Sequence, residues 1–373
     1  MKTTENTPMH VMVLASGDLW AGAEAVVYEL VRGLHAFTGT RVTAVYLNEG
    51  RLAELTRAAG VETYVVEEGR HSFPSIAANL ALLTRRLKPR IIHSHRYKEN
   101  ILAALCAPAG GLPRLVTTQH GITETASTPR LRSVQFLETL LLRHCFSRVV
   151  AVSQDLEGYL ISGRGVPGYR VGQVYNGIDT DGATPERRSN GGRVVVGSAG
   201  RLVGVKDFGL MVDIAREVCA KRQDVDFVLA GEGPERAQLE EQVRASGLKG
   251  RLTLLGHVHD IAGFFSSLDI YLNTSKHEGI PMTVLEAMKN RLPVVVPDVG
   301  GMGEIVVHDR TGCLVRGRDA ASFAEVLLAL AGSPARREEL GTEALGRIKE
   351  RFSTRAMVQS YQALYRDVLG VPG

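Results

Sequence analysis

The feature that most constrains the fold of this chain is the alternation of short apolar runs with amphipathic stretches. Residues 10–17 (HVMVLASG) form one such run, which ends in a glycine. The stretch that follows, residues 22–37, brings Val26 and Leu30 to one face at helical spacing. Continuous apolar strands joined by helices favour a parallel sheet that is covered on both faces. The pattern therefore predicts a doubly wound α/β fold.

The alternation stops once, at residues 179–192, where the sequence DTDGATPERRSNGG is polar and rich in glycine. We interpret this stretch as a linker between two Rossmann-like domains, residues 1–178 and 193–353. We expect a helix at residues 354–373, which ends the chain and could cross back to the first domain. Because ligands of open α/β sheets bind beyond the carboxyl ends of the strands, we expect loops of the two domains to face each other across a cleft.

Composition and charge exclude some classes of protein. The net charge of +4 suits an anionic ligand or an acidic membrane face, and it is too small to indicate nucleic acid. No apolar run reaches the ~18 residues of a membrane span, and the run VMVLA is too short for a signal peptide. We therefore expect a cytoplasmic protein with peripheral membrane contact at most. The cysteines lack metal-ligand spacing and are expected to be reduced, buried thiols: Cys106, Cys145, Cys219 and Cys313.

Two loops of the first domain contain candidate ligand-binding residues. In SGDLWAGAE, Gly17 and Gly22 permit close approach of a ligand, and the helix N-terminus there favours an anion. The loop lacks the GxGxxG dinucleotide fingerprint, and a simple tight turn is the alternative. His120 follows a strand in QHGI and is expected to face the cleft, although a lone histidine is more often structural. His95 is a weaker candidate, whose expected role is local hydrogen bonding.

Two loops of the second domain contain charged candidates. Arg201 and Lys206, in SAGRLVGVKDF, are cations that could neutralise a diphosphate or could form only a solvated basic loop. Glu278 and Glu286 lie eight residues apart in HEGIPMTVLEAMK. On a helix this spacing places two carboxylates on nearly the same face, where each can accept two hydroxyl hydrogen bonds. The spacing alone is a weak indication, and the alternatives are a helix-dipole partner and a surface salt bridge.

Taken in order, these motifs resemble family 4 of the nucleotide-sugar glycosyltransferases, which have the two-domain GT-B architecture. The resemblance rests on GRLVGVK, the E-x7-E motif from Glu278 to Glu286, PVVVPDVGGMGEIV, YNGID and TGCLV, and it covers nearly all of residues 175–370. In the first domain it is looser and rests on AGAE, HSH, HGI and AVS. The resemblance implies that the first domain, residues 1–178, binds the acceptor and that the second, residues 193–353, binds the nucleotide sugar. The family implies a retaining enzyme that moves a hexose-type sugar from a nucleotide-diphosphate sugar to a carbohydrate or lipid-linked hydroxyl acceptor, in cell-envelope polysaccharide or glycolipid synthesis.

The resemblance also implies roles for single residues. Arg201 and Lys206 would bind the donor diphosphate and stabilise the leaving group, so no metal or cofactor is expected. Glu286 would bind the ribose hydroxyls, and Glu278 would bind hydroxyls of the transferred sugar. The other donor contacts implied are Gly22 at the diphosphate, His120 near the reacting carbon, Val258 at the base, and the backbone amides of Gly279, Ile280, Met282 and Thr283.

Three positions depart from the family pattern. Ala21 precedes Gly22 where the family has paired glycines, which affects how closely this loop approaches a ligand. Pro281 removes one backbone amide from the start of the glutamate helix. The stretch KNRLP stands where Cys-Gly is frequent before the proline, and we interpret that change as harmless.

Other functions remain open at this point. A metal-dependent transferase would need a DxD motif, and the two present lie at the start of a strand, Asp224 and Asp226, and in the linker, Asp179 and Asp181. A sugar-nucleotide 2-epimerase shares the fold and the length, and a pyridoxal-phosphate phosphorylase is usually far longer. A non-catalytic sugar-nucleotide-binding subunit would have the same fold. If the main chain binds the base, no side chain of the sequence indicates which base is bound. The sequence therefore does not distinguish UDP, GDP and ADP donors.

Residues 128–146 form a basic amphipathic stretch. Such a helix can dock on an anionic membrane, and the alternative is a sheet-covering helix with a solvated basic edge. The apolar residues of this stretch are Leu131, Phe136, Leu140 and Leu141, and the basic ones near them are Arg130, Arg132 and Arg143.

Overall fold

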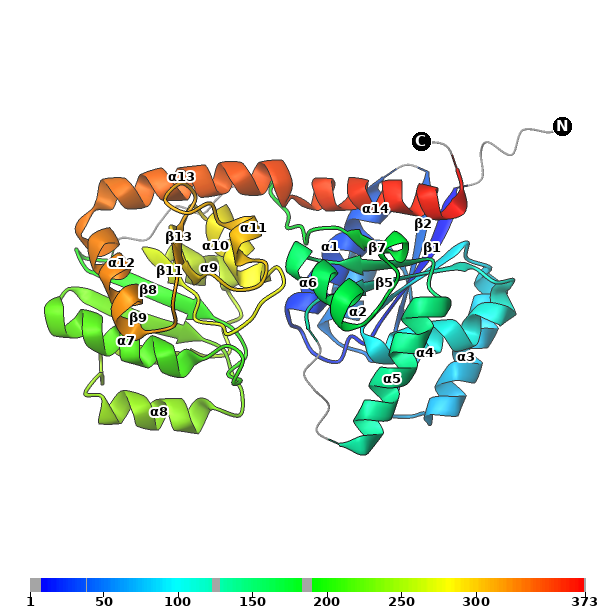
Figure 1. The fold of residues 1–373 in the computed structure, drawn as a ribbon, viewed down its shortest axis with the longest axis horizontal. Coiled ribbons are helices and arrows are strands. Elements are labelled where there is room, and N and C mark those ends of the chain that lie inside the picture. The colour runs from blue at the N-terminus through cyan, green and yellow to red at the C-terminus, as the bar shows by residue number, and fades with distance from the viewer. Residues whose placement is uncertain (1–7, 38, 123–127, 183–189, 372–373) are drawn as a thin grey trace. The chain divides into compact units, whose positions relative to one another are not determined.

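The computed structural model describes residues 8–371, apart from residue 38 and the segments 123–127 and 183–189. The chain forms two compact units. Unit 1 comprises Met1–Asp179 together with Thr354–Gly373, and unit 2 comprises Thr180–Ser353. Half of the predicted linker, residues 183–189, lies outside the described residues. Each unit is built around one parallel sheet with helices on both of its faces (Figure 1).

Unit 1 contains a seven-stranded sheet in the order β3-β2-β1-β4-β5-β6-β7, and its strand pairings are parallel. Its strands are β1 (Met9–Ala15), β2 (Thr40–Tyr46), β3 (Glu62–Val65), β4 (Ile91–His95), β5 (Arg114–Gln119), β6 (Arg148–Ala151) and β7 (Val171–Gln173). Its α-helices are α1 (Gly22–Ala36), α2 (Arg51–Ala58), α3 (Phe73–Leu87), α4 (Tyr97–Cys106), α5 (Pro129–His144), α6 (Gln154–Gly158) and α14 (Thr354–Leu369). Short helical turns occur at Ala107–Gly110, Tyr159–Gly163 and Gly168–Arg170.

Unit 2 contains a six-stranded parallel sheet in the order β10-β9-β8-β11-β12-β13. Its strands are β8 (Val194–Ala199), β9 (Val225–Ala230), β10 (Leu252–Gly256), β11 (Ile270–Leu272), β12 (Val294–Pro297) and β13 (Cys313–Val315). Its helices are α7 (Phe208–Lys221), α8 (Arg236–Ala245), α9 (Ile261–Ser266), α10 (Met282–Lys289), α11 (Met302–Ile305), α12 (Ala320–Gly332) and α13 (Pro334–Arg351). The predicted fold of two doubly wound α/β sheets is confirmed.

The apolar runs of the sequence become strands because both faces of each sheet are covered. In β1, four successive side chains, Val11 to Leu14, have no exposed surface. A strand with one solvated face would alternate apolar and polar residues, whereas here helices pack on both sides. Burial of each such side chain contributes roughly 1.5–3 kcal/mol. This core holds the strand ends, and therefore the loops that follow them, in fixed positions.

The C-terminal helix α14 packs on unit 1 through two buried tyrosines. The hydroxyl of Tyr365 lies 2.6 Å from Nδ1 of His93, and Nε2 of His93 lies 2.8 Å from the hydroxyl of Thr118. Thr118 is also 2.7 Å from the hydroxyl of Tyr361. Burial lowers the pKa of His93 to about 3, so this imidazole is neutral. Helix α14 therefore belongs to the core of unit 1, although unit 2 separates the two in sequence.

One sequence expectation fails at a cysteine. The structure contains four free thiols, of which Cys106, Cys219 and Cys313 are buried as expected. Cys145 is exposed, because it follows the last residue of α5 at a turn rather than the inner face of the helix. Among the described residues, no helix is both long enough and apolar enough to span a membrane.

Candidate functional site

The strand order of each sheet reverses at one place. In unit 2 the strands run outward from β8 through β9 to β10 on one side, and from β11 through β12 to β13 on the other. In unit 1 the same reversal falls between β1 and β4. Loops that leave neighbouring strands in opposite directions open a crevice beyond the carboxyl ends, which is where ligands of such sheets bind. The four loops after β8, β11, β1 and β4 are therefore the candidate ligand-binding elements.

The two loops at the switch point of unit 2 are tied to each other. The hydroxyl of Thr274, in the loop after β11, donates a 3.0 Å hydrogen bond to the carbonyl of Lys206, in the loop after β8. The backbone N–H of Lys276 donates to the carbonyl of Val205 at 2.8 Å. These bonds keep the predicted cationic loop and the predicted acidic loop side by side.

Lys206 and Glu278 meet at this junction. The ammonium of Lys206 forms an ion pair with Oε1 of Glu278, and the hydroxyl of Ser275 donates a 2.7 Å hydrogen bond to the same oxygen. Both charged side chains are largely shielded from solvent, with 24% and 13% of their surface exposed. The sequence assigned these residues to different parts of a ligand, whereas in the structure each neutralises the other. Ser275 was missed, because a serine in a loop has no distinctive sequence signal.

Two glycines fix the backbone of these loops. A Cβ at Gly300, whose φ is +51°, would lie 2.0 Å from the carbonyl oxygen of Glu278. A Cβ at Gly231, whose φ is +144°, would lie 1.8 Å from the carbonyl oxygen of Gly200. At both positions a neighbouring loop presses against the candidate site, and a side chain has no room. The site backbone is therefore held from outside as well as by its own hydrogen bonds.

Arg201 differs from Lys206 in its surroundings. It is the second residue after β8, and its side chain is exposed. Among the residues that the structure describes, no carboxylate forms an ion pair with Arg201. An unpaired guanidinium at a switch point presents a planar set of five N–H donors to an anion. Of the two predicted cations, Arg201 is therefore available and Lys206 is occupied by Glu278.

Helix α10 presents one open face at this edge. Only Met282, Thr283, Glu286 and Lys289 of its eight residues are partly exposed, and the other four are buried. Glu286 therefore shares a face with the first turn of the helix, whose start at Pro281 has no capping side chain. Gly279 and Ile280 precede the helix and are buried. The helical-spacing argument for Glu278 was wrong, because the helix begins four residues after it.

The remaining predicted donor contact, Val258, follows β10. This strand lies at the edge of the sheet, two positions from β8, and Val258 is partly buried between the exposed residues His257 and His259. Their rings form an edge-on pair with centroids 4.7 Å apart. Val258 thus lies beyond the carboxyl end of its strand, as the switch-point loops do, but at the outermost strand of the sheet.

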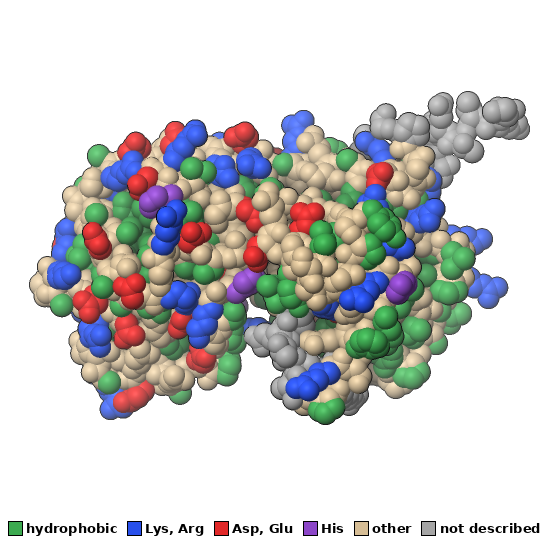
Figure 2. Space-filling model, viewed as in Figure 1, with side chains coloured by type: hydrophobic (Ala, Val, Ile, Leu, Met, Phe, Trp, Pro, Cys, Tyr) green, Lys and Arg blue, Asp and Glu red, His purple; other side chains and the backbone are tan. Residues whose placement is uncertain are grey.

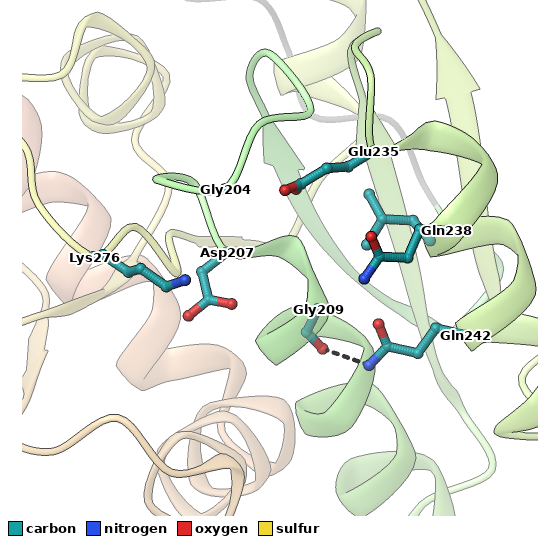
Figure 3. Close-up of a pocket in the computed structure, with 8 residues that line it drawn as sticks. Gly204, Asp207, Gly209, Glu235, Gln238, Gln242 and Lys276 are labelled. Carbon is teal, nitrogen blue, oxygen red and sulfur yellow. Dashed lines mark hydrogen bonds between the residues drawn. The ribbon is translucent and has the colours of Figure 1, made fainter. Parts of the chain in front are cut away.

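A cavity near this edge does not coincide with the candidate site (Figure 3). Its volume is about 150 Å³, which is below the ~300 Å³ at which small-molecule sites usually begin. Asp207, one of its lining residues, pairs with Arg318, and Gln242 donates to the carbonyl of Gly209 at 3.1 Å. Arg201, Lys206, Glu278 and Glu286 do not line it. The cavity is therefore a gap between loop and helix rather than the ligand site. Its lining comprises Gly204, Asp207, Gly209, Glu235, Gln238, Leu239, Gln242 and Lys276.

The DxD sequence at Asp224 and Asp226 lies at the amino ends of the strands, opposite the ends where ligands bind. β9 begins at Val225, so both carboxylates are at the amino end of the strand. Asp224 pairs with Arg222, and Asp226 pairs with Arg193 and Arg251. These carboxylates connect neighbouring strand ends, away from the loops where a ligand binds.

In unit 1 the two candidate histidines are in direct contact. Nδ1 of His95 lies 3.0 Å from Nε2 of His120, and the rings stack with centroids 5.3 Å apart. Burial lowers the pKa of His120 to about 3 and that of His95 well below its ordinary value, so both imidazoles are neutral. Gly22 is the first residue of α1 and is exposed, and Ala21 before it contributes no capping side chain. The local hydrogen-bonding role expected for His95 therefore includes His120 itself.

Sequence reasoning missed the most constrained residue of this edge. Arg96 follows β4 directly at the switch point and has a φ of +72°, which is unusual for a residue with a side chain. Its guanidinium lies 2.6 Å from the buried carboxylate of Glu24 and 3.7 Å from Asp18. The available signal was its position, because it is the first residue beyond a strand end at the predicted ligand edge.

Each of the two units contains a region that matches a known protein family. Residues 20–182 match the family described as Glycosyltransferase Family 4, and residues 193–333 match Glycosyl transferases group 1. The two matches together span most of the chain, and each falls largely within one unit.

Three proteins illustrate the similarity. The Escherichia coli UDP-Gal:alpha-D-GlcNAc-diphosphoundecaprenol alpha-1,3-galactosyltransferase is 25% identical over 67% of this chain and 68% of its own length. The Bacillus anthracis N-acetyl-alpha-D-glucosaminyl L-malate synthase is 26% identical over 79% of each chain. Anabaena HepE, solved with UDP, superposes with a TM-score of 0.82 at 19% identity, over 96% of this chain and all of that one. The chain spans about half the length of two further curated relatives.

Proposed function

This chain belongs to glycosyltransferase family 4, and we propose that it transfers a hexose-type sugar from a nucleoside-diphosphate sugar to a hydroxyl group of an acceptor. The observation that carries this proposal is the meeting of Lys206 and Glu278 beside the open face of α10, at the switch point of unit 2. The E. coli relative uses, by its name, a UDP-sugar, and HepE was solved with UDP. Both support a nucleotide sugar as the donor.

Donor binding exchanges the ion pair between Lys206 and Glu278 for two new contacts. The ammonium turns to the diphosphate, and the freed carboxylate accepts hydrogen bonds from hydroxyls of the sugar. Ser275 keeps its hydrogen bond to Glu278 during the exchange and holds the carboxylate in place. Arg201 supplies the second cation, and Glu286 receives the ribose hydroxyls on the open face of α10. The resting pair thus keeps two desolvated charges neutral until the donor arrives.

In the transfer step, the bond from the anomeric carbon to the β-phosphate oxygen breaks as the acceptor oxygen bonds to that carbon from the same face. The acceptor proton passes to the departing phosphate oxygen, and the configuration at the carbon is retained. Arg201, Lys206 and the amides at the start of α10 are arranged where negative charge develops on the phosphate. These groups supply the charge stabilisation without a metal.

Two alternatives make different predictions for the same assay. A sugar-nucleotide 2-epimerase converts the donor to its epimer when no acceptor is present. A non-catalytic sugar-nucleotide-binding subunit binds the donor and neither hydrolyses nor transfers it. A transferase hydrolyses the donor slowly on its own and transfers its sugar once an acceptor is supplied.

The test is calorimetric binding and donor hydrolysis with UDP-, GDP- and ADP-sugars. We expect one nucleotide to be selected, and Lys206→Ala to lower turnover at saturating donor by about 10²–10³, as for the loss of one charge-stabilising donor. Lys249→Ala is the matched control, because this exposed lysine precedes β10 at the amino edge of the sheet. Undiminished turnover in Lys206→Ala would remove the diphosphate role. Binding of no donor by the wild type would refute the proposed function.

A lipid-linked acceptor requires access to a membrane surface, and unit 1 has a suitable face. Helices α3, α4 and α5 lie side by side on one side of the sheet (Figure 1). They expose large apolar side chains, including Leu82 at 65% and Phe136 at 66% of their surface. Figure 2 shows hydrophobic side chains gathered over α4 and α5 on the near face. The exposed apolar residues of these helices also include Tyr97, Leu105, Leu137 and Leu140.

The charge of this face suits anionic lipids. Arg85, Arg86 and Arg132 are exposed on it. Of the described residues between 82 and 148, only Glu99 and Glu138 are acidic, and both are buried. The side chains of the predicted membrane residues 130 and 131 lie outside the description, and Leu141 is partly buried. We therefore place peripheral membrane contact on the whole α3–α5 face rather than on α5 alone.

Vesicle co-sedimentation tests this contact. We expect binding to vesicles that contain an anionic phospholipid, weaker binding to purely zwitterionic vesicles, and loss of binding in the double variant Phe136→Ser and Leu140→Ser. Leu255→Ser, at an exposed leucine of unit 2, is the matched control. Equal sedimentation of the double variant and the wild type would refute a membrane role for this face.

A further inference from the structure

Buried polar atoms without partners gather at one edge of unit 1. Among the residues that the structure describes, eight buried side-chain nitrogen or oxygen atoms lack a hydrogen-bond partner. Six of the eight belong to five residues that end or follow β1, β4 and β5: Glu24, His95, Glu99, Gln119 and His120. Such atoms are rare in folded proteins, and each requires an explanation. They lie beneath the partly exposed guanidinium of Arg96 at the switch point, where ligands of such sheets bind, and they mark this part of unit 1 as the candidate ligand site.

The cations of this edge are already neutralised. Arg96 binds Glu24 and Asp18, and Lys98 binds Glu68. The two histidines carry no charge, as described above. The atoms left over are carboxyl oxygens, imidazole nitrogens and one amide nitrogen. This set contains no free positive charge, so it suits groups that both donate and accept hydrogen bonds without charge of their own.

Arg96 is the residue placed to contact such a ligand. The Arg96 side chain is 38% exposed, whereas the Glu24 side chain is only 4% exposed. Glu24 and Asp18 engage part of its guanidinium, which has five N–H donors in total. Arg96 has a positive φ, and strained backbone of this kind clusters at functional sites. Glu24 acts through Arg96, and it is therefore a positioning residue.

We propose that Arg96, held by Glu24, binds the acceptor through uncharged sugar hydroxyls, so that the acceptor ends in a neutral sugar unit rather than in a carboxylate or phosphate. This inference rests on the proposed function, because it assigns the acceptor half of the same reaction. It distinguishes the chain from its B. anthracis relative, whose named product contains malate, an anion. The E. coli relative acts, by its name, on a sugar-terminated lipid diphosphate.

The sharpest test is Glu24→Gln, which keeps the shape of the side chain and frees the charge of Arg96. Binding of uncharged alkyl glycosides is measured by calorimetry in the presence of the nucleoside diphosphate that the enzyme selects, beside the same glycosides carrying a 6-phosphate. We expect the wild type to prefer the uncharged series by tenfold or more. In Glu24→Gln the preference should shift toward the phosphorylated series by about tenfold, since one freed charge-assisted contact is worth about that factor.

Arg96→Lys and Glu54→Gln complete the experiment. Arg96→Lys retains the charge and loses the planar donor set, so we expect acceptor affinity to fall about tenfold while donor affinity is unchanged. Glu54→Gln removes an exposed carboxylate of α2 and should alter neither. Preference of the wild type for phosphorylated glycosides, binding of neither series, or an unshifted preference in Glu24→Gln would overturn the proposal. Donor binding in every variant would leave the proposed function standing, and its loss in the wild type would refute that function instead.

Discussion

The buried carboxyl of Glu99 makes a stability prediction that follows directly from its surroundings. Its side chain is 1% exposed, and both oxygens lack a partner among the described residues. Burial raises the pKa of Glu99 to about 7, against an ordinary value of 4.5. Above pH 7 the folded protein therefore holds a desolvated charge that the unfolded chain exposes to water. We expect Glu99→Gln, which mimics the protonated acid, to stabilise the protein at high pH.

The magnitude follows from proton linkage. A folded pKa raised above the unfolded one contributes stability that is present below pH 4.5 and is lost as the pH rises through about 7. A difference of about 2.5 units corresponds to about 3 kcal/mol at pH 8, at about 1.4 kcal/mol per unit, and to less than about 1 kcal/mol at pH 5. The gain from Glu99→Gln should therefore be about 3 kcal/mol at pH 8 and small at pH 5.

The assay uses the single tryptophan of the chain. Trp20 lies in the loop after β1, so its fluorescence during guanidinium unfolding reports on unit 1 rather than on the whole chain. This choice matters because two units need not unfold together. Unfolding curves of the wild type and Glu99→Gln at pH 8 and pH 5 give the two differences. Equal or reduced stability of Glu99→Gln at pH 8 would show that this carboxyl is not charged and unpaired in the folded state.

Three further predictions concern the core of unit 1 and the contact of Gly300 with the loop that contains Glu278. Tyr365→Phe leaves Nδ1 of His93 without its 2.6 Å partner and should cost about 1–3 kcal/mol by the same fluorescence, whereas Tyr169→Phe at an exposed tyrosine should stay within about 0.5 kcal/mol. Because the pKa of His93 in the folded protein is lowered to about 3, the contribution of His93 to the free energy of unfolding is full above pH 6.5. That contribution falls by about 1.4 kcal/mol per pH unit as the pH drops toward 3. The pH dependence of unfolding should therefore become shallower in His93→Gln, and an unchanged pH dependence would contradict this reasoning. Gly300→Ala places a Cβ 2.0 Å from the carbonyl oxygen of Glu278, so donor affinity measured by calorimetry should fall at least tenfold; unaltered affinity would show that the loop relaxes freely.

The stability and binding predictions at the β1–β4 edge are linked. A buried, unpartnered carboxyl is costly to the fold, and costly features of this kind cluster at functional sites. If Glu99→Gln stabilises unit 1 and also weakens acceptor binding, the unpartnered atoms of this edge belong to the ligand site. Stabilisation with unchanged binding would assign Glu99 to the core alone.

Sequence pattern was enough for the fold because the physical cause is local. A run such as Val11 to Leu14 is apolar on both faces, and only a strand covered on both sides buries it fully. The family motifs were readable for the same reason, since each is a short stretch at one strand end. The exposed Cys145 was misjudged because it lies just past a helix end, where periodicity no longer reports burial.

What the sequence determined by itself is the class of architecture, the family, and the loops in which ligand-binding residues lie. Only the tertiary structure decided which of those residues meet, because contacts between loops depend on strand order and not on separation along the chain. The order β8-β11 brings Lys206 against Glu278, and the order β1-β4 brings Arg96 to Glu24, each pair separated by about seventy residues. Neither pair has a spacing that periodicity could reveal, since pairing between loops has no period.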